Sequence, residues 1–405
     1  MTYSWYLTDE RLAIQAEARR FAMEEVLPLA NELDPQKADI PRSFLDRMGE
    51  MGYFGITLPR EVGGMGLGVF EYCLVAEELA RAWMSVASII ARAQGMGTNI
   101  GDQDKRRRLL ERSAAGQWIG AAAFSEPGAG SDLANVQCLA ERDGDEWVIT
   151  GEKRWCGNAR NADFIQLLAR TSDPAPDGPR SAGLSTFVIE KERGTFPDGL
   201  RGSVIDKVGY HGMSTFHLWF EGLRVADENR VGSRGAESGR RDDAGGDRSG
   251  RSAFAATQAA LNIARVHTAA RAVGLARGAL EDCVAYSGER VQFDRPIAGF
   301  QAIRFKIADM AAEIEAARAL WYQVAQAMDD GQPVEKEAAM AKLHATEMAV
   351  RVTGEGIQIH GGNGYTTERS VERYWRDARL TTIFEGTSEI QRRTISDRLL
   401  GRAGS

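Results

Sequence analysis

The stretch IRFKIADMAAEIEAARALWYQV, residues 303–324, decides the C-terminal half of the fold. Its apolar side chains return every three or four residues, which is the spacing of one face of an α-helix: Ile303, Ile307, Met310, Ile314, Ala317 and Val324. A long amphipathic helix buries such a face against other helices. The chain beyond Phe254 is helical throughout, with short connections, so residues 254–405 are predicted to form an antiparallel helical bundle.

Upstream of the bundle, the first residues are also predicted to be helical. From Thr8 to about Leu27 the pattern predicts a helix in which Thr8 caps the N-terminus and Pro28 marks the end. Further helix-like stretches cover 43–52, 69–82, 85–98 and 104–115. Residues 1–118 are therefore predicted to be an N-terminal helical domain.

Between the two helical regions the pattern changes to short β-type runs. They lie at 147–150, 164–168, 184–189 and 216–220, separated by polar turns, and predict an antiparallel β domain over 119–232. Residues 233–252 contain only Ser, Arg, Gly, Ala, Glu and Asp, a composition that predicts a flexible insertion or linker over 233–253. The fold class is α+β, mainly α.

Composition excludes several functions for this chain of 405 residues. With 50 Lys+Arg against 57 Asp+Glu the net charge is −7, which disfavours nucleic acid as the main ligand. No apolar run of about 18 residues predicts a membrane span, and the N-terminal stretch MTYSWYLTDERLAIQ does not resemble a signal peptide, so we expect a cytoplasmic protein. Four separated cysteines and five histidines form no CxxC or HExxH pattern, so neither a disulfide nor a metal site is expected.

The motifs that carry chemistry are each weak alone. Neither GxGxxG nor GxxxxGK[ST] occurs, which disfavours a Rossmann or P-loop nucleotide site. Glu385 lies in TTIFEGTSEI (381–390), where apolar neighbours are expected to desolvate a lone carboxylate and raise its pKa toward the range useful for proton abstraction. The same segment is equally consistent with a helix cap at Thr387 or Ser388.

Five segments in order resemble the acyl-CoA dehydrogenase family. They are AAAFSEPGAGSD (121–132), GEKRWCGNA (151–159), KVGYHGMSTFHLWFEGLRV (207–225), ERVQFDRPIAGFQAIRFKIADM (289–310) and QIHGGNGYTTERSVERYWRDARLTTIFEGTSEIQ (358–391). The resemblance implies an N-terminal helical domain, a central β domain and a C-terminal four-helix bundle. It also implies FAD held between domains and across a subunit contact, in a homotetramer.

The resemblance assigns roles to individual residues. Glu385 aligns with the catalytic base, and the alternative base position of the family holds Ala264, which cannot accept a proton. The implied cofactor-binding residues are Phe124, Ser125, Ser131, Trp155, Gly157, Arg290, Gln301, Gln358, Gly361, Gly362, Thr387 and Glu389. The implied substrate-binding residues are Ser131, Asn262, Arg265 and Gly386.

The activity implied is α,β-dehydrogenation of an acyl thioester, carried by CoA or by an acyl carrier protein, to the trans-2-enoyl thioester. Glu385 would take the α-proton, flavin N5 the β-hydride, and an electron-transferring flavoprotein or similar acceptor the electrons. Two alternatives stay open at this point. One keeps the fold with different chemistry, such as nitroalkane oxidation or elimination; the other is a non-catalytic flavin-bearing protein associated with nucleic acid.

One position departs from the family pattern. Gly157 stands where the family has a threonine whose hydroxyl lies near the reactive edge of the flavin, and Cys156 precedes it. The hypothesis is that this loss changes the flavin potential, the access of oxygen or the room for a bulky acyl group. A redox role for Cys156 is a further, weaker hypothesis.

Overall fold

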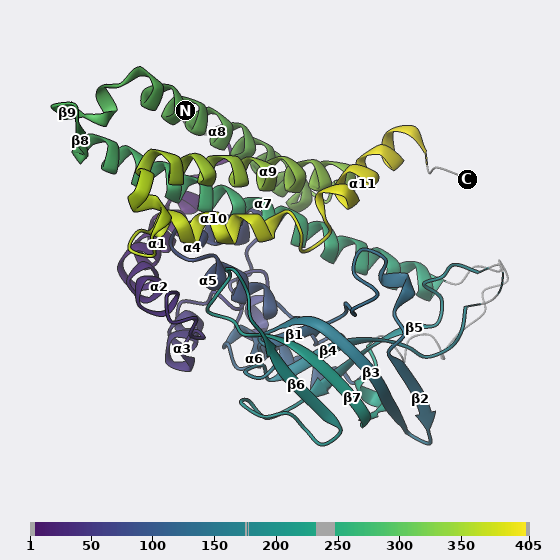
Figure 1. Ribbon diagram of the computed structural model, residues 1–405. Coiled ribbons are helices and arrows are strands. Elements are labelled where there is room, and N and C mark those ends of the chain that lie inside the picture. The colour runs from purple at the N-terminus through teal and green to yellow at the C-terminus, as the bar shows by residue number, and fades with distance from the viewer. Residues whose placement is uncertain (1–4, 175, 177, 232–247, 402–405) are drawn as a thin grey trace.

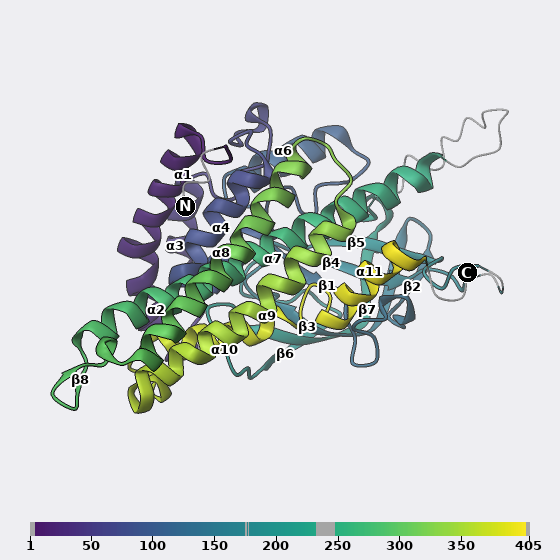
Figure 2. The ribbon, with the colours of Figure 1, turned by 90° about the horizontal axis from the view of Figure 1, so that it is seen from above.

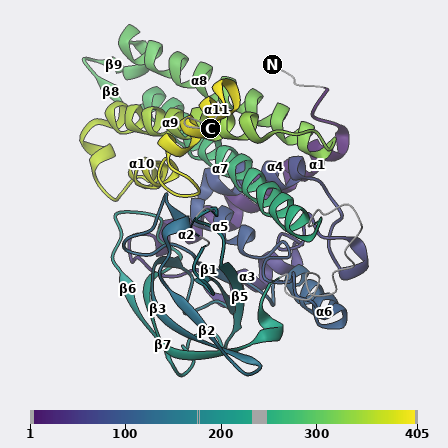
Figure 3. The ribbon, with the colours of Figure 1, turned by 90° about the vertical axis from the view of Figure 1, so that its right-hand side faces the viewer.

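The computed structural model describes residues 5–174, 176, 178–231 and 248–401. Helices at both ends of the chain flank a central region of strands, which confirms the predicted fold class (Figure 1). The bundle forms one layer and the sheet another, with the N-terminal helices beside them (Figures 1 and 3).

The N-terminal helices begin as the sequence predicts. Helix α1 (Asp9–Phe21) is capped by the Thr8 hydroxyl, which accepts a hydrogen bond from the Arg11 N–H at 3.3 Å. The prediction that Pro28 ends this helix is wrong. A π-helical turn, η1 (Ala22–Val26), leads directly into α2 (Leu27–Leu33), and Pro28 lies in the first turn of α2, where its missing N–H costs little. The remaining helices of this region are α3 (Arg42–Glu50), α4 (Val69–Ala82), α5 (Met84–Ile89) and α6 (Gln103–Ala114).

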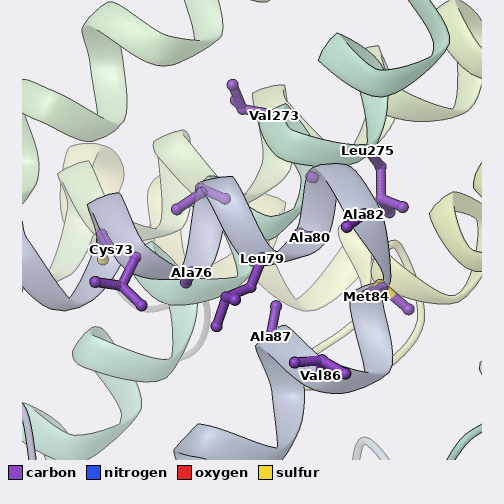
Figure 4. Packing of buried hydrophobic residues seen from close by; sticks show 14 of the residues in the cluster. Cys73, Ala76, Leu79, Ala80, Ala82, Met84, Val86, Ala87, Val273 and Leu275 are labelled. Atoms are coloured by element: carbon purple, nitrogen blue, oxygen red, sulfur yellow. The ribbon is translucent and has the colours of Figure 1, made fainter. Parts of the chain in front are cut away.

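Helix α4 joins the N-terminal region to the bundle. Almost all of its side chains are buried, and it packs along α7 (Arg248–Glu289) with Leu79 and Val273 in the same core (Figure 4). The two backbones approach closely at Gly274, where an added Cβ would lie 2.3 Å from the Glu77 carbonyl oxygen. Only glycine fits this crossing.

The central strands form one sheet in the order β1-β4-β2-β3-β7-β6, with β5 paired to β4. The prediction of an antiparallel sheet holds for most pairs, but β1 lies parallel to β4 and β2 meets β4 in parallel, so the sheet is mixed. Short β1 had no alternating pattern to reveal it. The bounds are β1 (Gly120–Ala123), β2 (Leu139–Asp143), β3 (Glu146–Gly157), β4 (Phe164–Arg170), β5 (Leu184–Glu190), β6 (Leu200–Ile205) and β7 (Thr215–Ala226).

The C-terminal bundle follows a segment outside the described residues. Residues 233–247 of the predicted linker lie there, whereas α7 already begins at Arg248. After α7 come the hairpin β8 (Val291–Gln292) and β9 (Arg295–Pro296), then α8 (Gln301–Asp329), α9 (Glu335–His360), α10 (Ser370–Thr381) and α11 (Ser388–Leu400). Helices α7, α8 and α9 pack against one another, α10 packs on α7 and α9, and α11 on α9 (Figure 2).

Two main apolar cores hold these layers. One is shared by the N-terminal helices and the bundle, with Phe21, Trp321 and Met348 among its members. The other lies within the sheet, around Ile149 and Leu218. Among the described residues, no helix is both long and apolar enough to cross a membrane.

Candidate functional site

Glu385 lies in the short loop between α10 and α11, which turns from the bundle toward the strands (Figure 1). The backbone is left-handed at Glu385 (φ 53°) and at Gly386 (φ 86°), and such a conformation at a glutamate is strained. The Gly386 carbonyl accepts hydrogen bonds from Lys342 Nζ at 2.7 Å and from Gln391 Nε2 at 3.0 Å. These two side chains hold the loop in its strained form.

The Glu385 carboxylate is engaged through both oxygens. Oε2 accepts a hydrogen bond from the Thr268 hydroxyl at 2.6 Å, and Oε1 accepts one from Arg271 Nη2 at 3.1 Å. The prediction of a lone carboxylate is therefore wrong, because a cation from α7 pairs with it. Its side chain remains 31% exposed, so a ligand has access to it.

Arg271 is the residue that the sequence analysis missed. Its side chain is 1% exposed, and it donates to the hydroxyls of Ser88 (2.6 Å) and Thr268 (2.7 Å) as well as to Glu385. Its only signal in the sequence is a single charge in the small, apolar run AARAVGLA (269–276). A charge in a buried face requires a partner, but the sequence does not say which.

The loop that carries Glu385 touches all three parts of the fold. The ring of Phe384 lies 5.0 Å from the Arg271 guanidinium and 6.0 Å from the ring of Tyr210, which precedes β7. Through Arg271 the loop is linked to Ser88 on α5. Glu385 is thus placed where the bundle, the sheet and the N-terminal helices meet.

Two of the predicted substrate-binding residues lie on α7, within the two turns that precede Thr268. Arg265 and Asn262 are buried, and Arg265 Nη1 donates to Asn262 Oδ1 at 3.0 Å. Burial lowers the pKa of Arg265. Arg265, Arg271 and Glu385 all act electrostatically on Lys342, so the four groups share one site.

The predicted flavin-contact residues of the β domain are also brought together. The Phe124 carbonyl accepts from Lys153 Nζ at 3.0 Å, and the Ser125 carbonyl accepts from the Arg154 N–H at 2.8 Å. Lys153 is fully buried and pairs with Glu126 at 2.7 Å, which fixes the loop after β1 against β3. Ser131, further along this loop, is exposed.

Trp155 and Gly157 lie at the end of β3. The Trp155 ring is 58% exposed on a left-handed backbone (φ 67°), an unusual setting for a large aromatic side chain. Gly157 is buried, and a Cβ added there would lie 2.9 Å from Arg92 Nη2. Arg92 therefore reaches the space that a side chain at 157 would fill.

Cys156, between them, is fully buried. Burial raises the pKa of its thiol to about 12, so a thiolate is not available at neutral pH. The hypothesis of a redox-active Cys156 has no support in this geometry.

A second set of predicted cofactor residues gathers beside the β8–β9 hairpin, at the far end of the bundle (Figures 1 and 2). Arg290, Gly361 and Gly362 line a pocket of about 450 Å³, and exposed Phe293 borders it. No atom lies within 4 Å of a Cβ added at either glycine. Gln301 and Gln358 are exposed on α8 and α9 but are not among the pocket residues.

Thr387 and Glu389 belong to the start of α11, near Glu385 rather than near the hairpin. The Thr387 hydroxyl caps α11 by accepting a hydrogen bond from the Ile390 N–H at 3.3 Å. The prediction of a helix cap in this segment is therefore confirmed, at Thr387. Glu389 is exposed in the first turn of the helix, where its negative charge is favourable.

These groups fit FAD. The Arg290 guanidinium and the open backbone at Gly361 and Gly362 suit phosphate groups. The exposed Trp155 ring, near the loop after β1, suits a flat ring system. They form two sets at different places on the chain. Within the described residues, no cluster of three or more His, Cys, Asp or Glu side chains is arranged to hold a metal ion.

Lys342 gives this site a testable pH dependence. Burial lowers its pKa to about 8, against the opposing effect of the Glu385 charge, from an ordinary value of 10.5. The folded state therefore loses the proton before the unfolded state does, and the free energy of unfolding rises between about pH 8 and 10.5 as the cost of a buried ammonium disappears. Denaturant unfolding should show the wild type gaining stability relative to Lys342→Met across this window.

Lys336→Met, which removes a more exposed lysine at the start of α9 and keeps Lys342, is the control for the loss of a lysine as such. A stability difference between wild type and Lys342→Met that stays constant from pH 8 to 10.5 would contradict the lowered pKa.

Three family models match the chain in succession. They are described as the N-terminal, middle and C-terminal domains of acyl-CoA dehydrogenase and match residues 8–117, 121–223 and 253–400. The chain is 38% identical over 402 residues to (2S)-methylsuccinyl-CoA dehydrogenase of Cereibacter sphaeroides, covering 97% of this chain and 70% of that protein. It is 38% identical over 394 residues to benzylmalonyl-CoA dehydrogenase of Aromatoleum aromaticum, covering 96% of this chain and 98% of that protein.

A solved structure has the same fold. Butyryl-CoA dehydrogenase from Megasphaera elsdenii superimposes with a TM-score of 0.84 at 32% sequence identity, over 97% of this chain and 99% of that one.

Proposed function

Since the chain belongs to the acyl-CoA dehydrogenase family, and is an FAD-dependent oxidoreductase that acts on the CH–CH group of acyl thioesters, we propose that Glu385 is its catalytic base. The observation that carries this assignment is the position of Glu385. It is a partly exposed carboxylate on a strained loop where the three parts of the fold meet. Family membership and the names of the relatives favour dehydrogenation over the two alternatives.

Removal of a thioester α-proton requires a positioned carboxylate and donors for the charge that develops on the carbonyl oxygen. Glu385 supplies the carboxylate, and its own backbone N–H is the donor that we assign on the protein side. Lys342 and Gln391 hold the loop through Gly386, which fixes both groups. Asn262 and Arg265 bind the substrate beyond the thioester, from the adjoining part of α7.

The cofactor-binding residues form two sets. Phe124, Ser125, Ser131 and Trp155 would hold the ring and ribityl part, and Arg290, Gly361 and Gly362 the phosphates from a neighbouring subunit. When bound, FAD supplies the hydride acceptor. Gln301, Gln358, Thr387 and Glu389 complete the proposed contacts.

Assembly, acceptor and location are also proposals. A homotetramer agrees with the two separated halves of the cofactor site on one subunit. An electron-transferring flavoprotein is the proposed acceptor, and the cytoplasm the proposed location. The carrier of the acyl group, CoA or an acyl carrier protein, stays open.

The test is an anaerobic panel of acyl thioesters, scored by bleaching of the oxidised flavin band. Purified protein reconstituted with FAD would be mixed with butyryl-CoA, (2S)-methylsuccinyl-CoA and benzylmalonyl-CoA, named for what the relatives act on. Bleaching by at least one, with the enoyl product identified by mass spectrometry, is the expected result. A protein that binds no flavin, or whose flavin no thioester reduces, would overturn the proposal.

Gly157→Thr tests the departure from the family pattern. The new side chain would displace the Arg92 guanidinium and fill space beside the acyl group. We expect kcat/KM for benzylmalonyl-CoA to fall about tenfold relative to butyryl-CoA, the scale typical of small changes in pocket size. Gly288→Thr, an exposed position with open space at Cα near the end of α7, is the control. An unchanged substrate profile together with an unchanged flavin potential would contradict the hypothesis.

A further inference from the structure

Arg271 is a buried cation whose paired carboxylate is the proposed base itself. The Arg271 side chain is only 1% exposed, so water does not screen the charge of its guanidinium. Within the described part of the chain, Glu385 is the only carboxylate that forms an ion pair with it. A buried guanidinium is tolerated only while such a partner balances its charge.

Proton abstraction removes that partner. When Glu385 accepts the α-proton it becomes neutral, and Arg271 is left buried without a negative charge at the moment of reaction. Before reaction the Glu385 carboxylate is engaged through both oxygens by Thr268 and Arg271, so it must give up these donors before it can take the α-proton. A neutral acyl chain corrects neither state, whereas an acyl chain with its own negative charge corrects both.

The surroundings of Arg271 suit an anion. Two hydroxyls, of Ser88 and Thr268, accept hydrogen bonds from the guanidinium, and the Thr268 hydroxyl donates to a carboxylate oxygen, that of Glu385, at 2.6 Å. Arg92, four residues after Ser88, has a buried Nε that meets no hydrogen-bond partner among the described residues. Arg265 and Lys342 are further cations at the site, and the carboxylates that act electrostatically on Lys342 are those of Glu385 and Glu389. The site thus has more positive than negative charge.

We propose that the acyl group of the substrate carries a free carboxylate in addition to its thioester. This carboxylate binds Arg271 and so releases Glu385 to act as the base. The free carboxylate of the substrate must lie close to its α-carbon. Glu385 must touch the α-hydrogen, and Arg271 Nη2 lies 3.1 Å from the Glu385 oxygen, so the free carboxylate belongs on the α- or β-carbon or one carbon further. Arg271 is a specificity-determining residue, and in the free enzyme the Glu385 carboxylate occupies the place of the substrate's.

This inference rests on the proposed function, and a set of matched substrates tests the inference separately from that function. The probes are (2S)-methylsuccinyl-CoA, its counterpart in which a carboxamide replaces the free carboxylate, and butyryl-CoA. Carboxylate and carboxamide have nearly the same size and shape, so their difference reports charge. We expect kcat/KM for the acid to exceed that for the amide by about 100-fold or more, because a site built for a charged group rejects its neutral analogue strongly.

Arg271→Met and Arg271→Lys locate the effect. The methionine variant should lose the preference for the acid over the amide, and the lysine variant should keep part of it. A second readout is the calorimetric affinity for acid and amide of enzyme whose flavin has been reduced beforehand with dithionite, so that no hydride can be transferred. Arg277→Met is the matched control: this arginine also lies on α7 and is 13% exposed, but it pairs with Glu78 at 2.5 Å, away from Glu385. It should lower stability and leave the preference intact.

The outcomes are distinguishable. Equal rates for acid and amide in the wild type, or a preference that survives Arg271→Met in a folded, flavin-bound protein, would overturn the inference. If kcat/KM for butyryl-CoA equals that for the acid, the proposed function stands and the inference fails. If no thioester bleaches the flavin, both fail.

Discussion

Glu385→Gln is expected to lower the rate of flavin reduction by an acyl thioester about 10⁴-fold, the upper range for loss of a positioned general base. The amide has the same shape and can still accept a hydrogen bond from Thr268, but it cannot take a proton. The measurement is the anaerobic rate of bleaching in a stopped-flow instrument, at a flavin content matched to that of the wild type.

Structure and chemistry have to be separated in this variant, because the amide also leaves Arg271 without its counter-charge. Thermal unfolding and substrate-analogue affinity should therefore be measured beside the rate. Glu347→Gln is the control, since Glu347 pairs with Arg392 in a similar contact at the surface of α9 and α11. If Glu385→Gln is folded and flavin-bound yet turns over within tenfold of the wild type, Glu385 is not the base.

Glu77→Gln is expected to lower the free energy of unfolding by about 3–5 kcal/mol, the usual cost of removing one partner from a buried ion pair. Glu77 on α4 is fully buried. It accepts hydrogen bonds from Arg318 Nε and Trp321 Nε1, each at 3.1 Å, and lies 3.9 Å from Arg277 Nε. The glutamine keeps an acceptor for the indole but leaves the arginines of α7 and α8 without this charge.

Thermal unfolding at fixed protein and FAD concentration would measure the loss. Glu24→Gln is the control, because Glu24 is an exposed residue of η1 paired with Arg20, and such pairs contribute at most about 1 kcal/mol. The double variant Glu77→Met with Arg318→Met should recover part of the loss, since removing both charges leaves fewer buried groups unpaired. A Tm for Glu77→Gln as high as that of Glu24→Gln would show that α4 is not anchored through this cluster.

How much the sequence predicted differs between helices and strands. The stretch from Ile303 to Val324 predicts its own helix because the apolar face repeats within the element, and the Thr8 cap acts within one turn. Strand β1 has no such signal, since it is only four residues, GAAA, and is defined by its parallel partner β4, more than 40 residues away. Pro28 was misread because the sequence around it does not show that a π-helical turn carries the helix past this position.

By itself, the sequence predicted the order of helices, strands and helices, because periodicity is local in the chain. Five local motifs carried the family resemblance, and the resemblance implied FAD and the proposal that Glu385 is the base. Only the tertiary structure decided the electrostatics of the site. Arg271 and Glu385 are 114 residues apart, and they meet because α7 passes beneath the α10–α11 loop. Arg92 reaches Gly157 in the same way, between a helix and a strand. The sequence does not distinguish a buried arginine from an exposed one, because the carboxylate that pairs with it depends on which elements pack together.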